Sequence, residues 1–178
     1  IASGAGDVLE FVPIAAAGRY RAEAGIGAAE QDPLDFSNAA DTSFSVLGPP
    51  VTVRAGDSLV VYNLGIANAA SVYDSPMTVR RAIPAAGAGL STITFTGTGT
   101  ALPFPSPGSR FQIVGTPVAY ACDLANSTLW RFSGYGWGLA AHPPSLATLN
   151  GLAGVTRSVV ANHVSACGFS YAPGALQR

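Results

Sequence analysis

The apolar and polar residues of this chain alternate over short stretches, which is the pattern of half-buried β-strands. The clearest example lies within residues 110–135, where two alternating runs, Val118–Cys122 and Thr128–Phe132, flank a polar turn. We predict that these runs form an antiparallel hairpin at the centre of the core. In such a pair the heavy side chains Tyr120 and Trp130 would lie across from or diagonal to each other.

The N-terminal part of the chain alternates in the same way. Residues 7–13 and 18–24 predict two strands, and we interpret them as a hairpin joined by Ile14–Ala17, although this apolar linker lacks the usual turn residues. Arg19 and Arg21 fall on one face of the second strand, together with Glu23. We interpret this charged row as a solvated face rather than as a binding surface.

Shorter runs predict further strands at residues 43–48, 51–53, 58–65, 77–83 and 91–97, and a closing strand that contains Cys167 and Phe169. Glycine- and proline-rich stretches predict loops, including residues 84–90 and 98–109. Single helical turns are predicted at residues 32–36 and 156–164. Because no longer helix is indicated, the predicted fold class is mainly β and antiparallel, in one domain over residues 1–178.

The composition of the chain argues against some classes of function. The net charge is -1 and 11% of the residues are charged, with no lysine among the nine basic residues. This balance argues against a nucleic-acid-binding protein, because contact with phosphates requires a basic surface. The sequence also lacks a run of about 18 apolar residues, the length expected of a transmembrane helix.

The two cysteines, Cys122 and Cys167, each lie in or at the end of a strand-like run. They are compatible either with one disulfide or with two free, buried thiols, and the position in neighbouring strands favours the disulfide. Closing a loop of this length would contribute about 4 kcal/mol in the chain-entropy model. A disulfide would place the protein in an oxidising compartment such as the periplasm.

A search for chemistry finds no candidate catalytic, cofactor-binding or metal-binding residues. The two histidines, His142 and His163, lack a nucleophile motif such as G-x-S-x-G, and we interpret both as structural or exposed residues. Asp32 and Asp35 lie close together, but two carboxylates in a loop are a weak signal for calcium. We therefore expect a protein that is not an enzyme.

Several segments together resemble the globular head of the MshO-like or PilW-like minor pseudopilins, prepilin-type proteins of type IV pilus and type II secretion-like systems. The resemblance runs from about residue 7 to residue 173. The segments that carry it are, in chain order, DVLEFVP, AAGRYRAEAG, DPLDF, DTSFSVLGPP, GDSLVVYNLG, RFQIVGTPVAYACD, STLWRFSGYG and VSACGFSYAPG.

The resemblance implies a pilin-like α+β fold, in which an N-terminal apolar spine helix packs on a β-rich head. It implies a subunit that initiates or caps a filament together with other minor pilins, with no enzymatic activity and no cofactor. It also implies a disulfide between Cys122 and Cys167 in the periplasm or on a cell-surface pilus. We expect the spine helix to precede Ile1 in the full-length protein as its inner-membrane anchor, and further strands to follow Arg178.

A second hypothesis is a secreted β-sandwich module that binds carbohydrate or another surface. Tyr135 and Trp137 lie among glycines, which is compatible with an exposed aromatic loop. The alternative interpretation, which we favour, is that these aromatic side chains fold over the core as a lid. A third hypothesis, a hydrolase that uses His142 or His163 with a nearby serine, has the least support.

Overall fold

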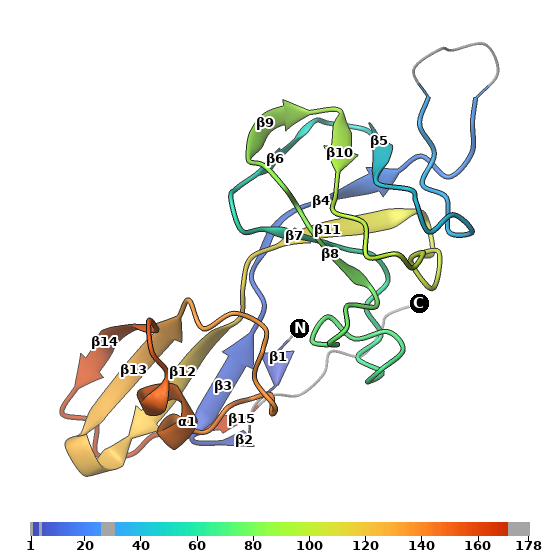
Figure 1. The fold of residues 1–178 in the computed structure, drawn as a ribbon. Helices are drawn as coiled ribbons and strands as arrows, with labels where there is room; N and C mark the ends of the chain where they lie inside the picture. Colours follow the sequence, from blue (N-terminus) through green and yellow to red (C-terminus); the bar gives the residue numbers. More distant parts are fainter. Residues whose placement is uncertain (1, 4, 26–30, 171–178) are drawn as a thin grey trace. The chain divides into compact units, whose positions relative to one another are not determined.

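The computed structural model describes residues 2–3, 5–25 and 31–170. Strands make up 38% of the described residues and helices 6%, and every strand pair in these ranges is antiparallel, which confirms the predicted mainly β class (Figure 1). The sequence predicted one domain over residues 1–178. The structure groups the chain into two compact units, unit 1 (residues 1–13 and 116–178) and unit 2 (residues 14–115).

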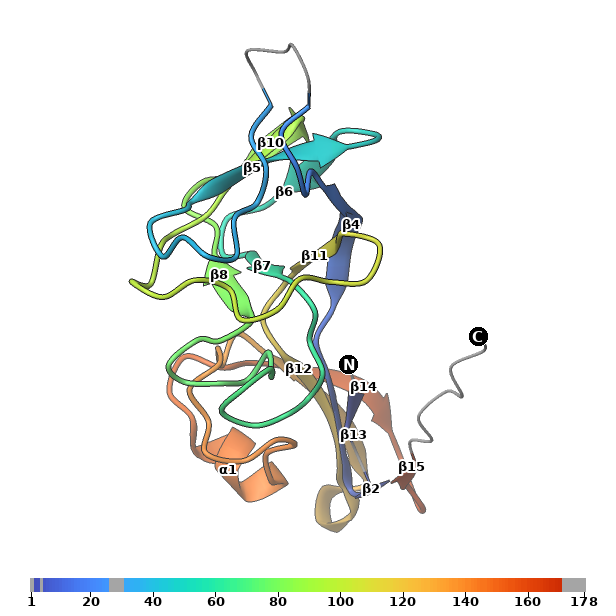
Figure 2. The ribbon, with the colours of Figure 1, turned by 90° about the vertical axis from the view of Figure 1, so that its right-hand side faces the viewer.

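Unit 1 is built on a five-stranded sheet that joins the first strands of the chain to its last third. The order across this sheet is β1 (Ala2–Ser3), β3 (Val8–Phe11), β12 (Val118–Asp123), β13 (Thr128–Ser133) and β14 (Thr156–Asn162). A small two-stranded sheet pairs β2 (Ala5–Gly6) with β15 (Phe169–Ser170). The helix α1 (Leu146–Gly151) lies on one face of the large sheet, as the two views in Figures 1 and 2 show.

The predicted central hairpin is present as β12 and β13. Its turn is the short 3-10 helix η1 (Leu124–Asn126), which Asp123 caps by accepting a hydrogen bond from the backbone N–H of Asn126. The expectation for the two large rings was wrong, because the register places Trp130 opposite Ala121 and therefore on the other face of the sheet from Tyr120. Tyr120 stacks instead on Phe11 of β3, with ring centroids 6.0 Å apart.

Unit 2 is built on a six-stranded sheet. Its order is β10 (Thr92–Thr94), β5 (Ser43–Leu47), β4 (Ile14–Tyr20), β11 (Arg110–Val114), β7 (Ser58–Val60) and β8 (Arg80–Ala82). A second, two-stranded sheet pairs β6 (Val51–Val53) with β9 (Gly87–Leu90). The apolar run that ends β7 and continues into Val61 is buried on both faces, since Leu59, Val60 and Val61 are each at most 2% exposed.

The predicted N-terminal hairpin was wrong. β3 pairs with β1 and β12, whereas β4 pairs with β11 and β5, so the two strands belong to different sheets and different units. The linker Ile14–Ala17 is itself the first half of β4. Because alanine carries little strand propensity, the strand is specified by its long-range partner β11 rather than by its own side chains.

Three local predictions were also wrong. Residues 156–162 form β14 rather than a helical turn, and residues 87–90 form β9 rather than a loop. Residues 32–36 form no helical turn, and Asp32 instead bonds β5 through its carboxylate and its backbone N–H. In each case contact with a strand distant in sequence overrides the local pattern.

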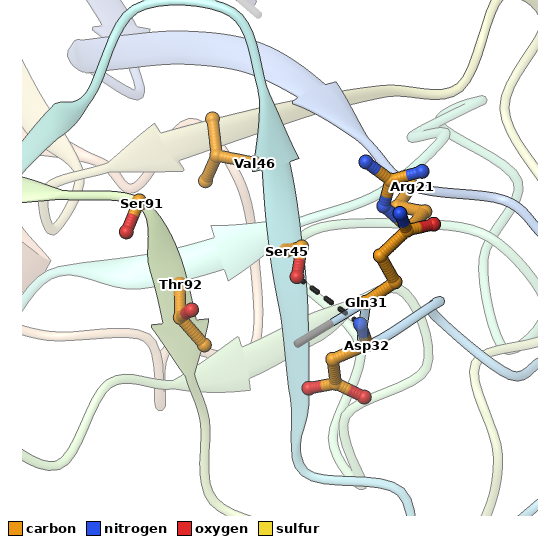
Figure 3. A pocket seen from close by; sticks show the side chains of 7 residues that line it. All are labelled: Arg21, Gln31, Asp32, Ser45, Val46, Ser91 and Thr92. Atoms are coloured by element: carbon orange, nitrogen blue, oxygen red, sulfur yellow. Dashed lines mark hydrogen bonds between the residues drawn. The ribbon is translucent and has the colours of Figure 1, made fainter. Parts of the chain in front are cut away.

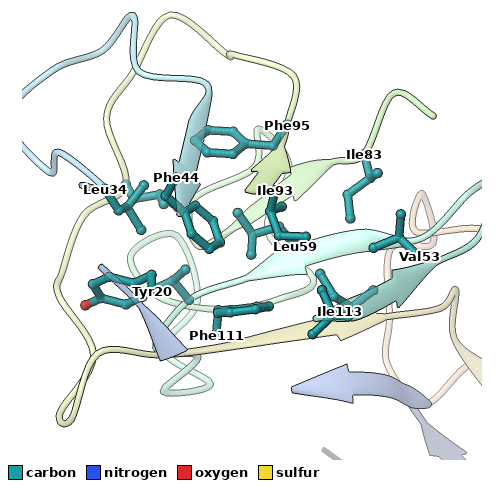
Figure 4. Close-up of a cluster of buried hydrophobic side chains, with 13 residues drawn as sticks. Tyr20, Leu34, Phe44, Val53, Leu59, Ile83, Ile93, Phe95, Phe111 and Ile113 are labelled. Carbon is teal, nitrogen blue, oxygen red and sulfur yellow. The ribbon is translucent and has the colours of Figure 1, made fainter. Parts of the chain in front are cut away.

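Aromatic rings fill the core of unit 2, and Phe44 lies at its centre with no exposed surface (Figure 4). Its ring centroid is 5.1 Å from that of Phe111 and 6.1 Å from that of Tyr20, both in edge-to-face geometry. Gly18 stands opposite Phe111 in the sheet. A Cβ atom at this position would lie 2.8 Å from the Phe111 ring, so the ring needs glycine there.

Candidate functional site

A disulfide joins Cys122 of β12 to Cys167, which lies just before β15. The two Cα atoms are 5.8 Å apart, a separation typical of disulfides, and the bond closes a loop with a sequence separation of 45. This loop contains β13, α1 and β14, so one covalent bond encloses most of the C-terminal half of unit 1.

The disulfide bears on where the protein works. It uses both cysteines of the chain, and structural disulfides persist in oxidising compartments, so it indicates a location outside the cytoplasm. None of the helices in the described ranges is long and apolar enough to cross a membrane.

A cluster of polar side chains in unit 1 surrounds Glu10, whose own side chain has no exposed surface. Glu10 lies on β3 between Val8 and Val12, and its side chain points to the same face as these two buried valines. Its Oε2 accepts a hydrogen bond from the Tyr135 hydroxyl at 2.9 Å, and its Oε1 lies 2.7 Å from Nδ1 of His142. When Glu10 is ionised it can only accept, so His142 then carries a proton on Nδ1.

The Glu10 contacts fasten the segment between β13 and α1 onto the sheet. The Tyr135 ring packs against the core of unit 1, which contains Val8, Phe132 and Leu149, while its hydroxyl holds the carboxylate. His142 adds a second attachment seven residues later, and only 12% of its side chain is exposed. The contacts of Tyr135 therefore agree with the lid interpretation rather than with an exposed aromatic loop.

A carboxylate next to a histidine is also a feature of nucleophilic active sites. In this protein Nε2 of His142, the atom that would take the proton of a nucleophile, is buried, and both cysteines are consumed by the disulfide. The second histidine, His163, is exposed and follows β14 in a left-handed backbone conformation with φ of 60°. The geometry of Glu10 and His142 therefore supports a structural role, in which a buried charge is satisfied by two fixed partners.

Unit 2 carries an open apolar groove of about 650 Å³, which we call the Phe104 groove. None of the described residues that line it is charged. Its apolar lining consists of Ala69, Pro76, Met77, Ala101, Pro103 and Phe104, and its polar lining of Asn68, Thr78, Thr98 and Thr100. Phe104 itself is 44% exposed, an unusual exposure for a phenylalanine.

A buried arginine holds the two walls of the Phe104 groove together. Arg81 is 1% exposed, and its Nη1 donates to the carbonyl of Thr78 at 2.6 Å, while its Nη2 donates to the carbonyl of Thr100 at 2.9 Å. Thr78 belongs to one wall and Thr100 to the other. Burial lowers the pKa of Arg81 and also that of its neighbour Arg80, the latter to about 10.

Asp74 organises the loop that forms the first wall. Its carboxylate accepts hydrogen bonds from the backbone N–H groups of Asn68 and Ser71, at 2.8 and 3.0 Å, and from the hydroxyl of Thr78. Burial raises the pKa of Asp74, but these hydrogen bonds outweigh it, so the pKa lies below its ordinary value. The Phe104 groove is therefore bounded by a loop with a fixed conformation.

A second hollow of about 580 Å³ lies beside β5 and is mainly polar (Figure 3). Its lining residues are Arg21, Gln31, Asp32, Ser45, Val46, Ser91 and Thr92. Asp32 accepts from the Ser43 hydroxyl at 2.6 Å, and its backbone N–H donates to the Ser45 hydroxyl at 3.1 Å. Through these hydrogen bonds Asp32 has a structural role, which is to hold its segment against β5.

The other residues that the sequence singled out have structural contacts. Arg19 donates from Nε to the carbonyl of Gly108 at 2.9 Å, and Asp35 accepts from the hydroxyl and the backbone N–H of Ser37. These bonds from Ser37 lower the pKa of Asp35. Within the described residues, no three side chains of His, Cys, Asp or Glu gather in a way that could hold a metal ion.

The sequence did not reveal the Glu10 cluster or the Phe104 groove. A signal for the first was present, because Glu10 falls on the same side of its strand as Val8 and Val12. The groove had no such signal, since its two walls come from loops about 25 residues apart that Arg81 joins.

Comparison with known proteins yields no family assignment. No protein-family model matches the sequence, and searches of curated proteins and of solved structures find no significant match.

Replacing Glu10 tests the fastening role. We expect Glu10→Gln to lower the free energy of unfolding by about 1–3 kcal/mol, because the amide cannot accept from both partners and leaves a buried polar group unsatisfied. Tyr135→Phe, the matched control, removes one hydrogen bond and should cost about 1 kcal/mol. Urea unfolding measures both values, and hydrogen exchange should rise in residues 134–145. Unchanged stability and exchange in both variants would contradict the role.

The lowered pKa of Asp74 predicts a dependence of stability on pH. Its contribution is complete above the unfolded-state pKa of about 3.9 and is lost as the pH falls through the lower native value. The stability difference between the wild type and Asp74→Asn should therefore be constant from about pH 5 to 7 and shrink below about pH 4. Urea unfolding at several pH values measures it, and a difference that stays constant down to pH 2 would be contrary to this account.

Proposed function

We propose that the protein is a non-enzymatic minor pseudopilin subunit, which assembles with other minor pilins to initiate or cap a type IV pilus-like filament. The observation that carries this proposal is the disulfide between Cys122 and Cys167. Each cysteine lies in a segment that resembles the family, and the bond joins these segments within an antiparallel, β-rich protein. The resemblance to the family implies this pairing.

The distribution of polar groups also supports an assembly role. The buried carboxylate of Glu10 holds Tyr135 and His142, and the buried guanidinium of Arg81 holds two loops. Buried and strongly hydrogen-bonded groups of this kind rigidify a fold. A rigid head suits a subunit whose task is to present fixed surfaces to its neighbours.

In this proposal the head lies in the periplasm, where the disulfide is stable, or on a cell-surface pilus. The full-length protein is held in the inner membrane by an apolar helix that precedes the present sequence. Its partners are other minor pilins and the machinery that assembles the filament. No cofactor takes part.

The Phe104 groove favours a second candidate, a secreted module that binds an uncharged surface or carbohydrate. Its size and its mixture of apolar and hydroxyl side chains are typical of ligand-binding clefts. Tyr135 no longer supports this candidate, because its hydroxyl is engaged by Glu10 and its ring by the core. The contact would instead centre on the exposed ring of Phe104.

The gene and its deletion test the proposal. The coding sequence before Ile1 should encode a short basic leader, then Gly-Phe-Thr-Leu-x-Glu and an apolar helix. Deleting the gene in the bacterium that carries it should reduce the number of filaments seen by electron microscopy, and the full-length gene should restore them. A different upstream sequence, or unchanged filament numbers, would overturn the proposal. Two results together would favour the second candidate. The deletion strain would make normal filaments, and the purified protein would bind a glycan array through a contact that Phe104→Ala removes.

A further inference from the structure

The outer strands of the two large sheets differ in length. Within the described residues, these strands are β1 and β14 in unit 1 and β8 and β10 in unit 2. β1 has two residues, and β8 and β10 have three each, whereas β14 has seven. Short outer strands are one way in which proteins prevent unwanted pairing, because every outer strand presents unpaired backbone N–H and C=O groups. β14 lacks this protection.

The side chains of β14 also offer little protection. Six of its seven residues are exposed, and Val159 and Val160 are each 49% exposed. The strand contains no proline and no acidic residue, and Arg157 carries its single charge. Proteins usually guard exposed outer strands with charged side chains or proline, whereas valine favours further pairing.

The charge of Arg157 is directed onto its own sheet. Its guanidinium carbon lies 4.2 Å from the centroid of the Trp130 ring, and its Nη1 donates to Oδ1 of Asn150 at 3.1 Å. The register explains this geometry, since Arg157 faces Phe132 and is diagonal to Trp130 on the same face. The one charged side chain of β14 therefore packs against its own unit rather than standing free at the edge.

One irregularity limits where a new strand can pair. Trp130 is opposite Val159 and Leu129 is opposite Ala161, so Val160 is an extra residue in the ladder. Residues 156–159 keep a regular register with β13. A partner strand would therefore pair over the first part of β14 and end near the bulge.

We propose that a second copy of this chain pairs with β14, strand against strand and antiparallel, and extends the five-stranded sheet across a two-fold axis. The sequence of β14 is compatible with itself in this arrangement. Pairing centred on Ser158 keeps the contact before the bulge and places Arg157 opposite Val159, so the two arginines do not face each other, and it places Thr156 opposite Val160. This inference is independent of the proposed filament function.

The length of the contact sets its strength. A pairing over so few residues buries less area than a permanent dimer, so the association is weak and depends on concentration. It becomes important where many copies are held close together, because a high local concentration raises the occupancy of a weak contact.

Sedimentation velocity over a range of protein concentrations tests the proposal. The wild type should shift from the mass of a monomer toward twice that mass as the concentration rises. Val159→Lys and Val160→Lys should each weaken self-association by about tenfold or more, because lysine places a free charge at the edge in both copies. Since both valines are about half exposed, the fold should be retained, and far-UV circular dichroism checks this.

Ile66→Lys is the matched control, because Ile66 is 54% exposed and lies in unit 2. This variant should self-associate like the wild type. The proposal fails if the wild type is a monomer at every concentration. It also fails if self-association survives both lysine variants of β14, or if Ile66→Lys removes it equally, since association would then come from another surface.

Discussion

The bond between Cys122 and Cys167 encloses much of unit 1 in one covalent loop. Its loop holds β13, the segment fastened by Tyr135 and His142, the helix α1 and the outer strand β14. In the chain-entropy model such a bond contributes about 4 kcal/mol by restricting the unfolded chain, a large part of the stability of a typical domain. Without it, the outer strand β14, with six of its seven residues exposed, would depend mainly on its pairing with β13.

The polar groups of both units serve the fold. Glu10 places a carboxylate in the interior of unit 1, and two partners more than 120 residues away in the chain form hydrogen bonds with it. Arg81 places a guanidinium group in the interior of unit 2, and this group donates hydrogen bonds to backbone carbonyl groups that include those of two loops. Removing one partner of such a group costs more than the bond itself contributes, because the other group remains buried and unsatisfied. These contacts therefore fix one conformation of each unit, and a protein that works by docking requires such fixed surfaces.

Local side-chain patterns explain which elements the sequence could predict. Alternation identified β3, β5, β10 and the hairpin of β12 and β13, although five of the six residues of β12 are buried and both of its faces are covered. It missed the first half of β4, where alanines carry no strong preference, and it assigned β14 to a helical turn although valines lie at its centre. Pairing between distant strands decided both cases, and a single sequence does not display such pairing. The disulfide could be favoured from two strand-like runs, whereas the partners of Glu10 depend on a fold that brings β3 beside β12.

The central claim is that a covalent bond between β12 and the C-terminal segment holds unit 1 together and marks the protein as one that works outside the cytoplasm. Titration of thiols in the purified, unreduced full-length protein tests it most directly, with and without guanidinium chloride. The account predicts no reactive thiol under either condition, and two thiols after reduction and unfolding. Two reactive thiols in the unreduced, unfolded protein would contradict it.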